Sequence, residues 1–478
     1  MANQAAAFQL LLFQTSIEIM RPKYQIGEDE LETLQRKTFG YFIHEVNSTN
    51  GLVADKTEAN WPASIAATGL ALAAYPVGVE RGFMTRIAAM ERTLTTLRFF
   101  WNSPQGPEPE ATGYRGFYYH FLDMQTGRRV WGCELSTVDS AFLLAGALAA
   151  GAYFNGDNAE EIEIRSLADA LYRRCDWAWA QNGKATVTHG WRPEDGFITF
   201  RWEGFDEALL LYVLGLASPT HPLPKDSYVS WGSTYRWEHR YGYSYAYAGS
   251  LFTHQLSHIW IDFRGIQDAF MRDKGIDYFE NSRRATYVQQ RYAIENPLNF
   301  AGYGEHCWGI TASDGPGPET LKLQGIERTF FDYLGRGVPY GPDDGTLAPW
   351  AVVASLPFAP DIVLPAISFY VREIELKQTN PYGFKASFNP THPGEPGNSF
   401  GCWVSPWHYG LNQGPIILMI ENYRSGMLWR LMRNCPYIRE GLVRAGFTGG
   451  WLAKAGDSAG RGGRAMDAGA STTGAELQ

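Results

Sequence analysis

The chain has 478 residues, of which 45% are hydrophobic, 19% charged and 14% aromatic, the balance of a well-packed globular protein. Its net charge is −9, and because no long basic block is present, nucleic acid and anionic membranes are poor partners, whereas a neutral, hydroxyl-rich ligand fits. No stretch approaches the roughly 20 apolar residues of a membrane-spanning helix.

In chain order, residues 1–28 are predicted to form an irregular arm. They lack a basic segment before the apolar run at 5–13, so they do not resemble a secretory signal, although this methionine need not be the natural start. Residues 29–455 are predicted to form one domain, because no linker composition interrupts them. The Gly/Ala/Ser-rich residues 456–478 are predicted to be a disordered tail.

Helical patterns recur throughout this domain. They cover residues 30–46, 63–76, 82–101, 136–155, 159–179, 205–217, 249–264, 276–295, 318–334, 346–357, 361–376 and 414–433. Some of these segments are apolar all round, as in 136–155, and others carry charges on one face, as in 159–179. Since a helix that is apolar all round must be surrounded by protein, the alternation predicts two concentric layers of helices.

Long loops rich in Gly, Pro and aromatic residues separate the helices, notably 103–118, 180–203, 298–317 and 379–413. Strand-like pieces at 185–191 and 196–202 predict small hairpins there. The 16 Trp and 26 Tyr residues either line a groove, where rings stack on sugar faces, or fill the core.

Carboxylates gather where two apolar helices are predicted to begin. Glu203, Asp206 and Glu207 precede the run ALLLYVLGLA, and if Asp206 caps that helix, Glu207 is free to point into a cavity. Glu134 and Asp139 precede the run AFLLAGALAA, where Ser136 and Asp139 also match a capping box. Solvated or capping acids are the alternative to a site in both places.

Other polar residues have weaker signals. Glu421 lies in an apolar helix, where a structural ion pair and a catalytic role are both open. Asp314 lies in turn-like sequence, where Asp is common for local reasons. His254 and His258 have i, i+4 spacing, but Gln255 stands where zinc enzymes require Glu, so a hydrogen-bonded core or groove role is preferred.

No nucleotide loop, nucleophile elbow or metal-ligand spacing is found in the sequence, and the five cysteines lack CxxC spacing. The sequence therefore predicts neither a cofactor nor a metal.

Eight segments carry a resemblance to a known family. They are WPASIAATGLALAAYPVGVERG (61–82), GFYYHFLDMQTGRR (116–129), ELSTVDSAFLLAGAL (134–148), DEALLLYVLGLASPTHP (206–222), LFTHQLSHIWIDFRG (251–265), WGITASDGPG (308–317), DDGTLAPWAVVASLPFAP (343–360) and QGPIILMIENYRSGMLW (413–429). In these segments, in the same order, the chain resembles the bacterial glucoamylase-like proteins, which include the family 144 endo-β-1,2-glucanases.

The resemblance implies an all-α (α/α)6 barrel whose long loops and small hairpins shape a cleft at one end. It implies hydrolysis of β-1,2-glucan or a close analogue, with Glu207 at the position of the general acid and Glu134 and Asp139 lining the same pocket. This chain departs from the family where Ala386 and Asn412 replace the usual Asp. These replacements leave the general base open.

Glycosidic cleavage needs one protonated carboxyl and one carboxylate. We expect inversion, with Glu207 as acid and a base from Glu134, Asp139 or Glu421. The residues expected to contact the sugar are His120, Trp131, Trp202, Glu203, Asp206, Tyr303, Trp308 and Asp314. A noncatalytic glycan-binding protein and a transglycosylase or retaining enzyme are the alternatives, and a polysaccharide lyase is disfavoured because no basic groove is evident.

Overall fold

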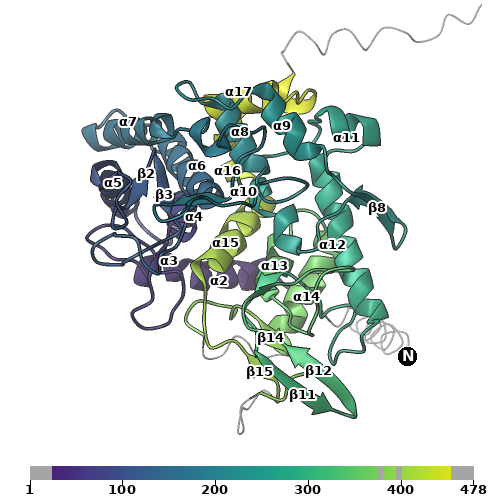
Figure 1. The fold of residues 1–478 in the computed structure, drawn as a ribbon. Coiled ribbons are helices and arrows are strands. Elements are labelled where there is room, and N and C mark those ends of the chain that lie inside the picture. The colour runs from purple at the N-terminus through teal and green to yellow at the C-terminus, as the bar shows by residue number, and fades with distance from the viewer. Residues whose placement is uncertain (1–23, 374–379, 395–400, 454–478) are drawn as a thin grey trace, which may run out of the picture.

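The computed structural model describes residues 24–373, 380–394 and 401–453. Its architecture is mainly helical, as predicted (Figure 1). The expected arm falls mostly outside these residues, and the expected tail at 456–478 lies wholly outside them. Within the part described, no helix combines the length and the apolar character needed to cross a membrane.

One group of helices is buried on nearly every side. It comprises α4 (Ile65–Glu80), α6 (Thr137–Tyr153), α8 (Leu209–Ala217), α10 (Leu256–Trp260), α13 (Pro349–Ala354) and α15 (Gly410–Arg424). Along this group, α4 contacts α6, α6 contacts α8, α8 contacts α10, and α15 contacts α10, α13 and α4. Gln255 adds a link from the start of α10 to α13, because its side-chain amide donates to the carbonyl of Ala351 at 2.6 Å.

A second group of helices is amphipathic and covers the first. It comprises α2 (Glu28–Phe39), α5 (Arg86–Asn102), α7 (Ala159–Arg174), α12 (Tyr278–Glu295), α14 (Pro360–Arg372) and α17 (Pro436–Arg444). Helix α2 packs on α15, α5 on α4, α7 on α6, α14 on α13 and α17 on α8. The predicted division into helices that are apolar all round and helices that carry charges on one face is therefore confirmed.

Shorter helices complete the helical part. They are α3 (Tyr41–His44), α9 (Lys225–Gly232), α11 (Ala269–Lys274), α16 (Met427–Arg433) and the 3-10 turns η1 (Trp179–Gln181), η2 (Leu251–His254) and η3 (Gly450–Leu452). The segment predicted as one helix at 414–433 is divided into α15 and α16, because Gly426 adopts a left-handed conformation with φ +66°.

A small antiparallel sheet joins the loops beside α6, with strand order β2-β3-β5-β6-β7. Its strands are β2 (Gly113–Tyr114), β3 (Phe117–Tyr119), β5 (Leu135–Ser136), β6 (Gly190–Arg192) and β7 (Gly196–Phe197). The strand-like pieces predicted at 185–191 and 196–202 form a hairpin only in part, as β6 and β7, and β6 also pairs with β5, so that Ser136 lies opposite Gly190. Pairing across these loops extends the sheet beyond a local hairpin.

Two strands lead directly into buried helices. Strand β1 (Ala63–Ser64) pairs with β4 (Phe121–Leu122) and ends at Ser64, whose hydroxyl accepts a hydrogen bond from the backbone N–H of Ala67 in α4. Strand β5 ends at Ser136, whose hydroxyl accepts one from the N–H of Asp139 in α6. Each serine satisfies an N–H group that the helix cannot pair internally, and so defines where the helix begins.

The helix predicted over 318–334 is wrong. Residues Glu319–Leu323 (β11) and Ile326–Phe330 (β12) form an antiparallel hairpin that projects from the helical body (Figure 1). The reversal uses Gln324 and Gly325, both with positive φ, which matches a tight hairpin turn and not a helix. The remaining strands are β8 (Trp237–Arg240), β9 (Tyr243–Ala246), β10 (Ala312–Ser313), β13 (Leu334–Gly335), β14 (Phe388–Asn389) and β15 (Trp403–Val404), which pair as β8-β9, β10-β13 and β14-β15.

Candidate active site

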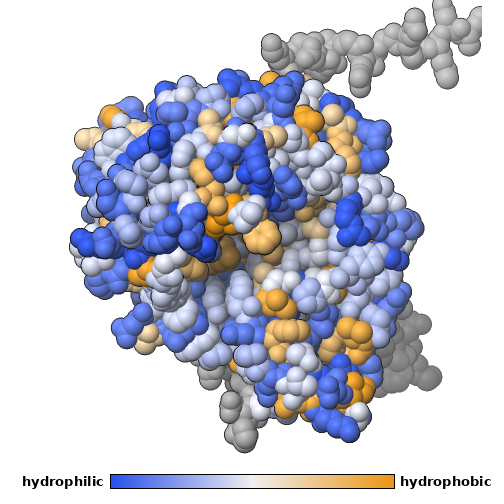
Figure 2. Space-filling model, viewed as in Figure 1, coloured by the Kyte–Doolittle hydropathy of each residue, from blue (hydrophilic) through white to orange (hydrophobic). Residues whose placement is uncertain are grey.

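A cavity of about 610 Å³ opens where the buried helices begin. Its wall includes residues from the first turn of a helix or from the few positions before it: Ser64 (α4), Ser136 and Asp139 (α6), Glu207 (α8), Leu256 (α10), Trp350 (α13) and Asn412 (α15). Helix N-termini carry positive partial charge, so this end of the helices suits a site rich in carboxylates. On the face shown in Figure 2, hydrophilic residues predominate and small hydrophobic groups surround a central hollow.

Glu207 lines this cavity as a half-buried side chain in the turn just before α8. Burial and the neighbouring Asp206 carboxylate raise the pKa of Glu207 to about 8. Within the described residues, its carboxyl group makes no ion pair that would counter this effect. A carboxyl group that keeps its proton at neutral pH can serve as a general acid.

Asp206 supports Glu207 from behind the cavity wall. Its carboxylate accepts hydrogen bonds from the backbone N–H of Ala208 at 3.0 Å and from the indole N–H of Trp231 at 2.9 Å. Burial outweighs these bonds and raises the pKa of Asp206 to about 7, and the charge of its ionised form opposes ionisation of Glu207. Asp206 thus caps the turn before the helix, close to the expected role, and is not among the residues lining the cavity.

His120 joins the acids of the α6 group. Its Nδ1 lies 2.8 Å from Glu134 Oε1, and its Nε2 lies 3.6 Å from Asp139 Oδ2. Burial alone would lower the pKa of His120, but the carboxylates of Asp139, Glu134 and Asp55 outweigh it and raise the pKa to about 9. His120 is therefore a cation at neutral pH and holds two carboxylates toward the cavity.

Glu134 and Asp139 differ in their surroundings. Burial raises the pKa of Glu134, but the hydrogen bond and the charge of His120 lower it more, so the net shift is downward. Asp139 accepts a hydrogen bond from the hydroxyl of Ser136, the residue that caps α6. Ser136 caps α6 as predicted, but the Asp139 carboxylate accepts from the hydroxyl of Ser136 and not from its backbone N–H, so the full capping box is wrong, and Asp139 lines the cavity.

Asp55 is a wall residue that we did not predict. Its carboxylate accepts a hydrogen bond from the indole N–H of Trp61 at 3.1 Å. Burial raises the pKa of Asp55 to about 6, against the opposing charges of His120 and Lys56. The sequence KTEANWPAS that follows it contains no helical or strand pattern, so nothing marks the acid as buried.

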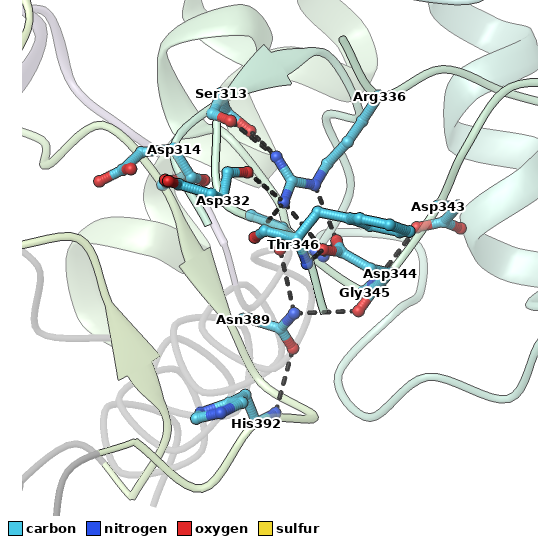
Figure 3. A network of polar contacts seen from close by, with 12 residues as sticks. Ser313, Asp314, Asp332, Arg336, Asp343, Asp344, Gly345, Thr346, Asn389 and His392 are labelled. Atoms are coloured by element: carbon cyan, nitrogen blue, oxygen red, sulfur yellow. Dashed lines mark hydrogen bonds and ion pairs between the residues drawn. The ribbon is translucent and has the colours of Figure 1, made fainter. Parts of the chain in front are cut away.

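Asp314 and Asp332 form another acidic part of the wall, and Arg336 holds the backbone beside both (Figure 3). The guanidinium of Arg336 donates to the carbonyls of Ser313 at 2.6 Å and Asp332 at 3.1 Å, and it forms an ion pair with Asp344 at 2.7 Å. Both partners of that pair are fully buried. Burial raises the pKa of Asp314, while the hydroxyl of Ser405 donates to it.

Aromatic side chains complete the wall. Trp202 is stacked on His189 with ring centroids 3.8 Å apart, and its indole N–H donates to the hydroxyl of Thr137 at 2.9 Å. Trp131 remains 59% exposed and packs edge-on against Trp61. Of the expected sugar contacts, His120, Trp131, Trp202 and Asp314 are therefore wall residues.

Other expected site residues lie outside the cavity. Glu421 forms a two-point ion pair with Arg81, at 2.7 and 2.8 Å, deep between α2 and α15. Because Glu421 does not line the cavity, its expected catalytic role is wrong, and the alternative of a structural ion pair is supported. Trp308 is fully buried, the hydroxyl of Tyr303 donates to Asp343 at 2.7 Å, and the exposed Glu203 accepts a hydrogen bond from Thr186. None of these three residues lines the cavity, so the expected contacts of Trp308, Tyr303 and Glu203 with sugar are wrong.

The two departures from the family pattern lie in different surroundings. Ala386 is fully buried and its backbone N–H donates to the carbonyl of Trp407, whereas Asn412 lines the cavity. His254 and His258 are buried away from the wall, with hydrogen bonds to Ala248 and Ser282, as the core interpretation predicts. Burial lowers the pKa of both histidines.

Comparison with known proteins gives consistent results. The family model described as "Putative glucoamylase" matches residues 199–436. The exo β-1,2-glucooligosaccharide sophorohydrolase of Parabacteroides distasonis is 30% identical over 448 residues, which cover 87% of this chain. The chain spans 58% of the length of that curated relative.

Solved structures are similar over about nine tenths of the chain. A putative glucoamylase from Bacteroides uniformis is 31% identical, with a TM-score of 0.79, and the match covers 90% of this chain and 100% of that one. An endo-β-1,2-glucanase from Chitinophaga pinensis, solved with sophorotriose and glucose, is 25% identical, with a TM-score of 0.77 and coverage of 89% and 100%.

Proposed function

The chain belongs to the glucoamylase-like family, and on this premise we propose that it is a glycoside hydrolase acting on β-1,2-glucan or a related β-linked glucan. The observation that carries the proposal is Glu207, a carboxyl group in the cavity wall with its pKa raised to about 8. The relatives that are named for β-1,2-linked glucose substrates support the choice of linkage.

In the proposed reaction, Glu207 donates its proton to the glycosidic oxygen as the bond to the anomeric carbon breaks. The same step leaves Glu207 as an anion. Because Asp206 opposes that anion, the group recovers a proton readily after product leaves. The positive His120 and the N-terminal ends of the helices compensate part of the negative charge that remains in the cavity.

We propose Asp139 as the base that activates water, with Glu134 as the alternative. Asp139 is close enough to Glu207 for its charge to raise the pKa of that acid. For inversion, the two carboxyl groups would lie roughly 6.5–9.5 Å apart, with one water between them.

We also infer that the buried helices close into an (α/α)6 barrel within one domain over residues 29–455. Their neighbour contacts and the helices that cover α4, α6, α8, α13 and α15 support this inference. A single hydrophobic cluster that includes both Leu31 and Leu452 supports the undivided domain.

The test is incubation of the protein with purified β-1,2-glucan, followed by measurement of new reducing ends. We expect reducing ends to accumulate, with the first product released in inverted anomeric configuration, as seen by NMR. Retention would reject the inverting course in favour of a retaining enzyme or transglycosylase. Failure to cleave any β-linked glucan would reject the hydrolase.

A noncatalytic glycan-binding protein is the second candidate function. Asn412 favours it, because it lines the cavity where the family pattern has an Asp, and an amide cannot act as a general base. Saturable binding of β-1,2-glucan without new reducing ends would establish this alternative.

A further inference from the structure

A second hollow of about 430 Å³ lies beside the cavity described above. We call them the side groove and the central cavity. They share the wall residues Lys56, Trp61 and Trp131. The rest of the side groove comes from residues 45, 54, 57–60, 62, 123–125 and 130. Because the shared residues border both spaces, a chain-like ligand in the central cavity can continue past them into the groove.

The boundary between the two spaces is an aromatic ridge whose parts are held in place. The indole N–H of Trp61 donates to Asp55 at 3.1 Å, and the ammonium group of Lys56 lies 3.7 Å from the centre of the Trp61 ring. Trp131 packs edge-on against Trp61, with ring centroids 4.8 Å apart and an interplanar angle of 66°. The ridge therefore presents indole surface whose orientation is set before any ligand binds.

Trp131 has two properties that packing does not explain. Its side chain is 59% exposed, although an indole ring gains free energy from burial. Its backbone is left-handed, with φ +57°, a conformation that costs free energy for a bulky residue and that proteins retain mainly at functional sites. The turn at 131–132 thus holds an aromatic surface in solvent at the mouth of both spaces.

The floor of the side groove is also rigid. The carbonyl of Met124 accepts hydrogen bonds from the side-chain amides of Asn47 at 2.7 Å and Asn50 at 3.0 Å. The carboxylate of Asp123 closes the same loop by accepting from the backbone N–H groups of Gln125 and Thr126. The polar side chains of Thr57, Glu58, Asn60 and Gln125 lie around this floor.

Indole faces beside uncharged amides, hydroxyls and carboxylates suit a ligand with flat apolar faces edged by hydroxyl groups. The same walls do not suit an anion, because the Lys56 ammonium group is already paired with Glu58 at 2.6 Å. We propose that the side groove is an additional sugar-binding subsite, and that β-linked gluco-oligosaccharides long enough to cross the Trp61–Trp131 ridge are preferred over shorter ones. This inference rests on the proposed function.

The test uses the Glu207→Gln protein, in which bound oligosaccharides stay intact, and isothermal titration with β-1,2-linked gluco-oligosaccharides of increasing length. Affinity should rise with length and then level off. Adding Ala59→Trp, which places an indole in the side groove, should weaken binding of the long oligosaccharides about tenfold, a change of about 1.4 kcal/mol, and leave the shortest ligands unaffected.

Ala178→Trp is the matched control, because Ala178 is exposed and borders neither space. Gln125→Trp, at another residue that lines the groove, provides a second blocking variant if Ala59→Trp does not fold. If both blocking variants bind every length as tightly as the control, the subsite is rejected while the proposed function stands. If no β-1,2-linked oligosaccharide binds and the wild-type protein cleaves none, the proposed function fails and the subsite fails with it.

Discussion

Among single residues, the chemistry of the cavity depends on which carboxyl groups keep a proton. Glu207 and Glu134 are the same residue type, but burial with a neighbouring anion raises the pKa of Glu207, whereas a neighbouring cation lowers that of Glu134. This separation assigns the acid role to Glu207 and leaves Glu134 ionised.

The pH dependence of kcat/KM follows from this assignment. Because Glu207 must be protonated to donate, activity should fall as pH rises through about 8, the pKa of that group. Initial rates on β-1,2-glucan from pH 5 to pH 10 provide the measurement.

Glu203→Gln is the control for this profile, since Glu203 is an exposed neighbour outside the cavity. It should leave the alkaline limb in place. Full activity maintained to pH 10 in the wild-type protein would contradict a proton held by Glu207.

Residue identity alone could not supply these roles. The sequence indicated Glu207, Glu134 and Asp139 because each lies where an apolar helix begins, and the cavity contains all of them. It did not indicate Asp55, His189, Asp332, Tyr333 or Tyr409, which come from irregular segments brought together by distant contacts. Glu421 shows the opposite error, since its partner Arg81 is 340 positions away.

At the scale of elements, α4 and α6 must approach closely for their first residues to share one cavity. Gly69 and Gly146 lie at this contact, and a methyl group added at Gly146 would come within 2.0 Å of the carbonyl of Gly69. The absence of a side chain thus determines how near Ser64 and Asp139 lie to one another.

Gly146→Ala should therefore destabilise the protein by about 1–3 kcal/mol and lower kcat/KM, because the helices must separate. Urea unfolding and initial rates measure the two effects. Gly151→Ala on the same helix is the control, since its added methyl group comes no closer than 3.3 Å to Ala168. Equal effects of the two variants would contradict a close contact at Gly146.

The β10–β13 pair and the loop after it depend on the buried Arg336–Asp344 ion pair. Arg336→Met leaves the Asp344 charge buried without its partner, which typically costs about 3–5 kcal/mol. We expect that loss in urea unfolding, together with reduced activity, because Arg336 also holds the backbone at Ser313 and Asp332.

Arg98→Met removes an exposed ion pair with Glu163 and is the matched control, worth about 0–1 kcal/mol. A loss for Arg336→Met no larger than for this control would show that the buried pair does not support the wall.

Prediction of the elements succeeded where the pattern is long and regular. The apolar and amphipathic helices from 63 to 174 lie close to their predicted positions, because burial enforces the helical period. The helix predicted over 318–334 was wrong because the turn residues Gln324 and Gly325 determine the structure of this segment. The helical pattern of the residues around them does not correspond to a helix. Short elements such as α9, α11 and β8–β9 carry too few residues for a periodic signal.

At the scale of the whole molecule, the two helix groups place the starts of six buried helices, among the residues described, at one cavity. A series of apolar helices covered by amphipathic ones could be predicted from the sequence, and so could the family. The walls of the cavity could not, since they depend on how the intervening loops fold over the helix ends.

The most direct test of the Glu207 assignment compares wild-type, Glu207→Gln and Glu203→Gln proteins on β-1,2-glucan, with folding verified by circular dichroism. We predict that Glu207→Gln loses turnover by about 10²–10⁴-fold, measured as reducing ends, while Glu203→Gln stays near the wild-type rate. A folded Glu207→Gln protein that cleaves the glucan at the wild-type rate would contradict proton donation by this carboxyl group.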